Sequence, residues 1–320
     1  MNEIGMCAAV FGDLALGEAL DRVTGTGFDV IDLPTDSPFR TLKEWWDGSM
    51  SGADVRRQLD EHGIKAACVS NSRDSLLLLG PYGPHTDPVL AGTPEEKRAH
   101  GRRAALRAID LAAEVGAPLA RLAFGCPDFA RWLDWQGSAV GWRDNVEAFA
   151  RESREILARA RDRGVRICVE THPKQIVFDF ASVKAFLEAM EDDLDVLSLC
   201  VDPANLATVG CRGEPLLRAV APHVSCLHVK DVEIWTGDTP PPADARWVRY
   251  GPQPPIRFRA MGWGDLDWRR LITVLVEIGY QGPYLVEHED VFVQREKGLV
   301  SARERLHALV QAGGRSRRTW

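Results

Sequence analysis

The sequence predicts an α/β protein whose parallel strands close into a single (β/α)8 barrel. Three observations lead to this fold class, and the first two are that eight apolar, β-branched runs recur along the chain and that helical patterns separate them. Because a helical crossover joins neighbouring parallel strands, strict alternation of strand and helix predicts a parallel sheet. The third observation is length, since the chain has 320 residues and barrels of this kind typically need about 250 plus insertions.

The expected strands are short runs that cover residues 3–10, 28–33, 64–70, 119–125, 165–171, 196–202, 224–230 and 283–289. The clearest helical pattern covers residues 93–118, where Thr93 is placed to cap the helix and Pro94 occupies its first position. Further helical patterns cover residues 141–164, 179–190 and 267–280. The remaining length falls in two expected loops, about residues 71–94 and 232–264, of which the second is rich in Pro and Trp.

An open, doubly wound sheet is the competing layout. It would carry a glycine-rich phosphate-binding turn after an early strand, and the sequence contains neither G-x-G-x-x-G nor G-x-x-x-x-G-K-[ST]. No Pro- or Ser-rich linker divides the chain. We therefore expect one catalytic barrel domain over residues 1–312, followed by a basic, frayed tail at residues 313–320.

Composition excludes several classes of function. The formal net charge of -7 argues against a nucleic-acid-binding protein, which needs clustered Lys and Arg. The amino terminus lacks the basic segment followed by an apolar segment that marks a signal peptide. No apolar run approaches the roughly 20 residues that span a membrane. The seven Cys are odd in number, contain no C-x-x-C motif and lie mostly in apolar runs. We expect reduced, buried thiols in a cytoplasmic protein.

Four polar side chains stand at the ends of four consecutive expected strands, namely Glu170, Asp202, His228 and Glu287. Taken singly, such a Glu is more often a solvated or ion-paired residue, and such a His is more often part of the core. The carboxyl ends of barrel strands meet at one rim, so the four should lie together. Three facing carboxylates repel one another, and one divalent cation would resolve that repulsion. Oxygen ligands with one imidazole favour Mn²⁺, while Co²⁺, Mg²⁺ and Zn²⁺ stay open.

Residues two positions further along share a face with these candidate ligands, because side chains alternate along a strand. His172 follows Glu170 in this way, Lys230 follows His228, and Glu289 follows Glu287. We expect His172 and Lys230 to contact substrate hydroxyls or a developing oxyanion. The alternative, equally open for Lys230, is a salt link to the carboxylates. Asp231 and His288 point to the opposite face and are expected to be structural.

Five motifs in this region carry a resemblance to a known family: "VETHP", "VDPANL", "LHVKD", "RFRAMGWGDLDW" and "GYQGPYLVEHED", spread over residues 165–290. The chain resembles the xylose-isomerase-like TIM-barrel superfamily of sugar isomerases and epimerases. The resemblance implies that Glu170, Asp202, His228 and Glu287 hold one divalent metal, and that the two Glu act as acid and base. It also implies a homo-oligomer, either a dimer or a tetramer.

The resemblance further suggests which residues bind substrate. An Arg before the G-x-G turn often contacts the substrate in this group, which indicates Arg259, or alternatively Arg257. Asn205 stands where relatives often have a His, and it is counted among the substrate-binding residues. This departure argues against a multi-metal site like that of the endonuclease IV proteins.

The function expected from these observations is that of a divalent-metal-dependent sugar isomerase or epimerase, which transfers a proton through a metal-stabilised enediolate of a keto- or aldo-sugar. One alternative is a lyase or dehydratase that eliminates a group from a keto-sugar, keto-inositol or 3-keto-glycoside. Its departing group could be protonated by His172 or Lys230, and Trp235, Trp247 and Trp263 could stack on a second ring or form a lid or an oligomer contact. Another alternative is a non-catalytic sugar-binding barrel.

Overall fold

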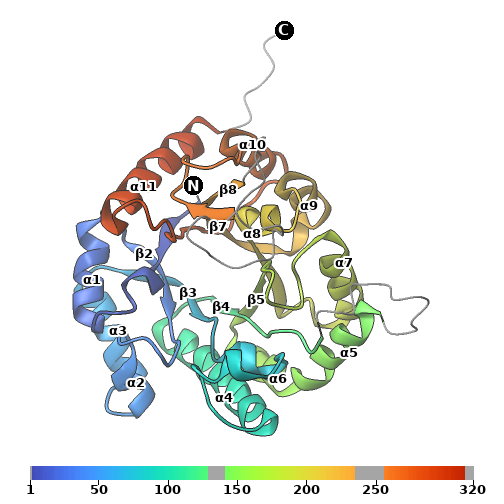
Figure 1. The fold of residues 1–320 in the computed structure, drawn as a ribbon. Helices are drawn as coiled ribbons and strands as arrows, with labels where there is room; N and C mark the ends of the chain where they lie inside the picture. The colour runs from blue at the N-terminus through green and yellow to red at the C-terminus, as the bar shows by residue number, and fades with distance from the viewer. Residues whose placement is uncertain (1, 129–140, 235–255, 314–320) are drawn as a thin grey trace.

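A computed structural model describes residues 2–128, 141–234 and 256–313 of this protein. Eight parallel strands close into a barrel, and helices surround it (Figure 1). In order around the barrel, the strands are β1 (Ile4–Cys7), β2 (Val30–Pro34), β3 (Lys65–Asn71), β4 (Leu119–Leu122), β5 (Arg166–Glu170), β6 (Leu197–Val201), β7 (Val224–Val229) and β10 (Tyr284–Val286). The expected fold class is confirmed, and each strand overlaps its expected run.

Local signals account for the outer helices. The longest, α4 (Pro94–Val115), begins with a capping box in which Thr93 and Glu96 satisfy each other's backbone N–H groups, and it ends at Gly116 with a φ of 76°. The expected helix over residues 141–164 is divided at Ser153 into α5 (Trp142–Glu152) and α6 (Arg154–Arg163). The remaining helices are α1 (Leu16–Gly25), α2 (Lys43–Asp47), α3 (Gly52–Glu61), α7 (Phe180–Ala189), α8 (Pro203–Thr208), α9 (Gly213–Ala219), α10 (Trp268–Glu277) and α11 (Arg295–Ala312).

The segment expected as a loop at residues 232–264 contains a small antiparallel sheet. Strand β8 (Asp231–Ile234) pairs with β9 (Ile256–Arg259), with Asp231 opposite Arg259 and Ile234 opposite Ile256. The expectation of a plain loop was therefore wrong at both ends of this segment. Trp235 and Trp247 lie outside the described residues, whereas Trp263 is described and is 52% exposed. Residues 314–320 of the expected tail also lie outside the described part.

The core has two parts. Large apolar side chains fill the space between the strands and the surrounding helices. A second cluster joins residues of seven barrel strands, which can meet only inside the barrel, and consists of Cys7, Cys68, Leu119, Cys168, Cys200, Cys226 and Leu285. None of the seven Cys forms a disulfide bond, and six of them are buried, as expected, while Cys211 is half-buried.

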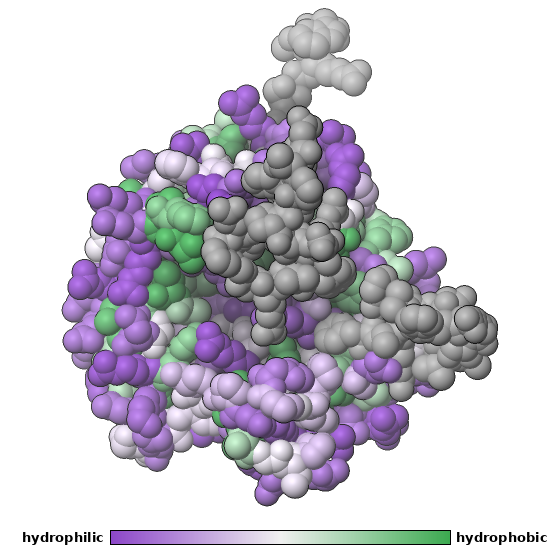
Figure 2. Space-filling view, in the orientation of Figure 1, coloured by the Kyte–Doolittle hydropathy of each residue, from purple (hydrophilic) through white to green (hydrophobic). Residues whose placement is uncertain are grey.

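The outer surface is mainly hydrophilic over the ring of helices (Figure 2). This distribution fits the charged residues on the outward faces of helices such as α6, where Arg161 pairs with Asp193 and Asp195. Among the described residues, no helix has the length and apolar character needed to cross a membrane.

Candidate metal centre

The barrel places the four expected ligands at the carboxyl ends of adjacent strands. Glu170 is the last residue of β5, and His228 lies near the end of β7. Asp202 follows β6 and caps α8, where its Oδ1 accepts hydrogen bonds from the Ala204 and Asn205 amides at 2.8 and 3.0 Å. Glu287 follows β10, and its amide donates to the Val229 carbonyl at 3.0 Å. Strand geometry thus brings four sequence-distant side chains to one rim.

The four side chains converge on a common point. One potential ligand atom from each of Glu170, Asp202, His228 and Glu287 lies within 4.8 Å of the others. The Nδ1 atom of His228 is 3.2 Å from Glu170 Oε1, 3.8 Å from Asp202 Oδ2 and 3.4 Å from Glu287 Oε2. The arrangement is therefore compact enough for one cation to contact all four.

Two buried atoms in this cluster fit a metal ion. His228 Nδ1 and Asp202 Oδ2 are buried and make no hydrogen bond within the described structure, although Lys230 Nζ lies 3.3 Å from the latter. A buried polar atom without a partner is costly unless something binds it. An imidazole nitrogen and carboxylate oxygens are suitable ligands for a divalent cation, so the residues present fit one.

Charge supports the same conclusion. With His228 neutral, as a metal ligand must be, four carboxylates in and beneath the cluster face two buried cations, which leaves an excess of two negative charges. These are Asp32, Glu170, Asp202 and Glu287 against Arg121 and Lys230. One divalent cation would neutralise this excess.

Glu170 and Glu287 stay ionised despite their burial. Burial favours the neutral form of Glu170, but the charges of His228 and Arg121 outweigh it and lower the pKa of Glu170 to about 2. Burial is likewise outweighed at Glu287, whose pKa is held well below its usual range by Lys230 and His228. The pKa of Lys230 is in turn raised, against burial, by Asp202 and Glu287. The centre therefore presents anions to whatever it binds.

The expected substrate-binding residues take different positions. Lys230 Nζ lies 2.7 Å from Glu287 Oε2 and 2.9 Å from Glu289 Oε2, and it lies 4.3 Å from the centre of the Phe258 ring. The salt link that sequence reasoning left open for Lys230 is thus present. Asn205 donates its amide to Glu170 Oε1 at 2.9 Å, so it orients a candidate ligand.

His172 lies at the rim with a defined tautomer. Its Nδ1 accepts the backbone N–H of Lys174 at 3.0 Å. Burial lowers the pKa of His172 to about 4, so the ring is neutral near pH 7. The proton of the neutral ring therefore lies on Nε2, which leaves His172 able to donate one hydrogen bond.

Arg259 is engaged away from the four ligands. Its guanidinium pairs with Glu233 and with Asp290, the latter at 3.0 Å. Arg257 and Arg259 lie 5.3 and 5.9 Å from the centre of the Phe292 ring, which is 65% exposed. These contacts put both Arg side chains against the loop that follows β10.

Sequence reasoning missed two buried charged residues beneath the centre. Arg121 of β4 donates to Glu170 Oε2 at 2.7 Å and to Asp32 Oδ2 of β2 at 2.9 Å. Both residues are at most 3% exposed. The available signal was the single charged residue of the apolar run "LARLAFG" and the second of the two Asp in "FDVIDL".

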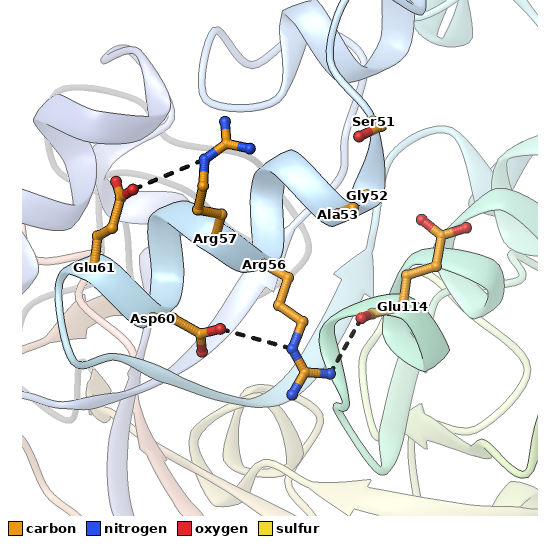
Figure 3. Close-up of a pocket in the computed structure, with 8 residues that line it drawn as sticks. All are labelled: Ser51, Gly52, Ala53, Arg56, Arg57, Asp60, Glu61 and Glu114. Carbon is orange, nitrogen blue, oxygen red and sulfur yellow. Dashed lines mark hydrogen bonds and ion pairs between the residues drawn. The ribbon is translucent and has the colours of Figure 1, made fainter.

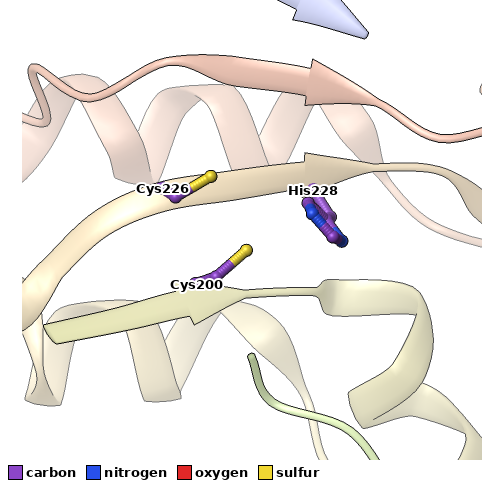
Figure 4. A group of neighbouring side chains, drawn as sticks. All are labelled: Cys200, Cys226 and His228. Atoms are coloured by element: carbon purple, nitrogen blue, oxygen red, sulfur yellow. The ribbon is translucent and has the colours of Figure 1, made fainter. Parts of the chain in front are cut away.

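Two other features of the structure are alternative candidate sites. A groove of about 800 Å³ lies between α3 and the end of α4, but its charged side chains face one another, as in the Arg56–Asp60 and Arg57–Glu61 pairs (Figure 3). Inside the barrel, the sulfur atoms of Cys200 and Cys226 face each other near His228 (Figure 4). The Nδ1 atom of His228 is directed to the carboxylates, so the carboxylate set is the better candidate.

The fold and this cluster define a (β/α)8 barrel with a candidate site for one divalent cation at its rim. Residues 20–309 match the family model of the xylose isomerase-like TIM barrel, and the chain belongs to this family. The expected resemblance is therefore confirmed. No curated protein matches the chain significantly.

Solved structures share the fold. A xylose isomerase domain protein from Planctomyces limnophilus is 24% identical, with 97% of each chain covered and a TM-score of 0.66. The apo form of 3-keto-D-glucoside 4-epimerase, YcjR, from E. coli is 15% identical over 96% of this chain and 100% of that chain, with a TM-score of 0.67. IolI with a bound zinc atom is 15% identical over 97% of this chain and 98% of that chain, with a TM-score of 0.68.

Proposed function

We propose that this protein is a divalent-metal-dependent sugar isomerase or epimerase that moves a proton at a carbon next to a carbonyl. The observation that carries the proposal is the convergence of Glu170 and Glu287 on His228 Nδ1, at 3.2 and 3.4 Å. The two Glu come from β5 and β10, which are separated by β6 and β7, so they approach one point from different directions.

Glu170, Asp202, His228 and Glu287 would hold the cation, with Mn²⁺ expected first and Co²⁺, Mg²⁺ and Zn²⁺ as alternatives. When bound, a divalent cation supplies Lewis acidity that makes a proton next to a carbonyl easier to remove. The likeness to a zinc-bound barrel and to a 3-keto-glucoside epimerase supports this choice of chemistry.

The residues of the chain then have distinct tasks. One of Glu170 and Glu287 takes the proton from the carbon, and the same or the other Glu returns it. Return to the neighbouring carbon isomerises the sugar, whereas return to the opposite face of the same carbon epimerises it. Lys230 holds Glu287 ionised and can donate to a substrate oxygen, and His172 can donate from Nε2.

Solvent exchange tests the proposal directly. Protein loaded with Mn²⁺ is incubated in deuterated water with keto-sugars and 3-keto-glucosides, and deuterium at the carbon next to the carbonyl is measured by NMR. We expect Glu170→Gln and Glu287→Gln to lower the exchange rate by at least about 100-fold. Glu289→Gln is the matched control, because Glu289 also contacts Lys230 but is outside the four ligands and its side chain is 46% exposed.

Full exchange in both variants would contradict the assignment of acid and base. An unsaturated product, seen by its ultraviolet absorbance, would instead indicate the lyase reaction. Sugar binding without any exchange would indicate the non-catalytic barrel.

A further inference from the structure

A chain of buried contacts joins the second ring nitrogen of His228 to Glu170 through the opposite half of the barrel. His228 Nε2 lies 3.6 Å from Cys7 Sγ, and Cys7 Sγ lies 3.9 Å from Asp32 Oδ2. Arg121 then links Asp32 Oδ2, at 2.9 Å, to Glu170 Oε2, at 2.7 Å. None of the five residues is more than 5% exposed. The contacts are thus shielded from water, which could otherwise replace them.

The donors and acceptors along this series of contacts set the direction of its hydrogen bonds. A guanidinium only donates, and Asp32 Oδ2 accepts both from Arg121 and from the Cys7 thiol. The Cys7 thiol donates its S–H to Asp32, so its sulfur is left as the acceptor for His228 Nε2–H. In the neutral ring that a metal ligand requires, a proton on Nε2 leaves the lone pair of Nδ1 free, and Nδ1 is the nitrogen that faces the carboxylates.

We propose that Cys7 and Asp32, the latter held by Arg121, are positioning residues that keep His228 in its Nε2–H tautomer and so prepare Nδ1 to bind the cation. The opposite tautomer would direct a proton at the cation. Partners of this kind typically change metal affinity by about 10–100-fold when removed. A thiol takes the place here that a carboxylate or a backbone carbonyl usually takes beside a metal-binding His. The inference rests on the proposed function only through its metal site.

Metal affinity tests the inference without any substrate. Metal-free protein is titrated with Mn²⁺, and free Mn²⁺ is followed by electron paramagnetic resonance. We expect Cys7→Ala to weaken binding by about 10–100-fold. Cys7→Ser should stay within about threefold of wild type, since a hydroxyl can both donate and accept. Cys68→Ala is the matched control, because Cys68 is a fully buried thiol of the same interior cluster whose sulfur bonds the Val69 carbonyl.

The tautomer itself is the second readout. Burial lowers the pKa of His228, but neighbouring thiols and carboxylates outweigh burial and raise that pKa, so the spectra are recorded at a pH high enough to leave the ring neutral. In metal-free protein labelled with ¹⁵N-histidine, the His228 signals are identified by their loss in His228→Asn. Wild type and Cys7→Ser should show the proton on Nε2, and Cys7→Ala should show a mixture. An Nδ1–H tautomer in wild type, or wild-type affinity in Cys7→Ala, would overturn the inference. Failure of wild type to bind any divalent metal would overturn the proposed function instead, while the tautomer measurement would still decide this inference.

Discussion

Replacing Arg121 with Met should strongly destabilise the fold, because it removes a buried cation from two buried carboxylates. Arg121 lies 2.9 Å from Asp32 and 2.7 Å from Glu170, and its side chain is 4% exposed. Removing one partner from a buried ion pair typically costs about 3–5 kcal/mol, since the other charge is left uncompensated. Met keeps much of the aliphatic volume of Arg, so the loss of charge dominates. We therefore expect the free energy of unfolding to fall by about 3–5 kcal/mol.

Urea unfolding in the presence of a chelator measures this loss, with the fluorescence of the 10 Trp as the signal. Arg161→Met is the matched control, since Arg161 also pairs with two carboxylates, Asp193 and Asp195, each at 2.7 Å. Its side chain is 39% exposed, so water screens both pairs and the expected loss is about 0–1 kcal/mol. Burial is therefore the main difference between the two variants.

The pH dependence gives a further check on the same variant. In wild type the pKa of Glu170, lowered to about 2 by His228 and Arg121 against burial, lies below its value in the unfolded chain. Its stabilising contribution is therefore complete above about pH 4.5 and disappears as the pH falls towards 2. The difference between wild type and Arg121→Met should shrink over that range. The reasoning would be refuted if Arg121→Met lowered the free energy of unfolding by less than about 1 kcal/mol at pH 7. It would also be refuted if the difference between wild type and this variant did not change with pH.

Three other substitutions test the cluster and its surroundings. Asp202→Ala and His228→Ala should each abolish stoichiometric Mn²⁺ binding in elemental analysis of dialysed protein, and retention of one ion per chain in both would exclude this cluster as the site. Asp36→Asn addresses stability near the rim, because burial, followed by the charge of Asp74, raises the pKa of Asp36 to about 6. Since the folded pKa exceeds the unfolded value of about 4, wild type should lose roughly 2–3 kcal/mol relative to the variant as the pH rises from 4 to 6. Urea unfolding at a series of pH values measures this, and an unchanged difference would contradict it.

The sequence was sufficient to predict the barrel and the residues that stand at the carboxyl ends of its late strands. Alternating apolar strands and helical patterns identify a parallel sheet without any long-range information. Once parallel pairing is assumed, residues such as Glu170 and Glu287 must share a rim although they lie on separate strands. The topology therefore predicts their convergence, and the distances to His228 Nδ1 agree with it.

Contacts between distant charged residues could not be predicted in this way. Arg121 binds carboxylates that lie 89 and 49 residues away in the sequence, and a single Arg in an apolar run does not identify its partners. The pairing of β8 with β9 was missed for a similar reason, because neither strand is long enough to show a clear alternation. The engagement of Arg259 by Asp290 and Glu233 likewise depends on where two loops meet.

Lys230 offers a test that separates charge from ligation at the centre. Its Nζ lies 2.7 Å from Glu287 Oε2 and 3.3 Å from Asp202 Oδ2, the same oxygens that face His228 Nδ1, so its ammonium competes with a cation for them. Lys230→Gln removes that competitor and raises the negative excess from two charges to three. Mn²⁺ should therefore bind about tenfold more tightly, equivalent to about 1.4 kcal/mol.

The same variant should exchange the substrate proton at least about 100-fold more slowly, because a group able to donate to a substrate oxygen is lost. Lys184→Gln is the control for net charge alone, since Lys184 lies in an exposed pair with Glu188 at 3.7 Å and should leave both quantities unchanged. Weaker Mn²⁺ binding in Lys230→Gln would mean that Lys230 supports the ligands more than it competes with the cation. Tighter binding together with slower exchange would show that this Lys is kept at the expense of metal affinity because the reaction needs its charge.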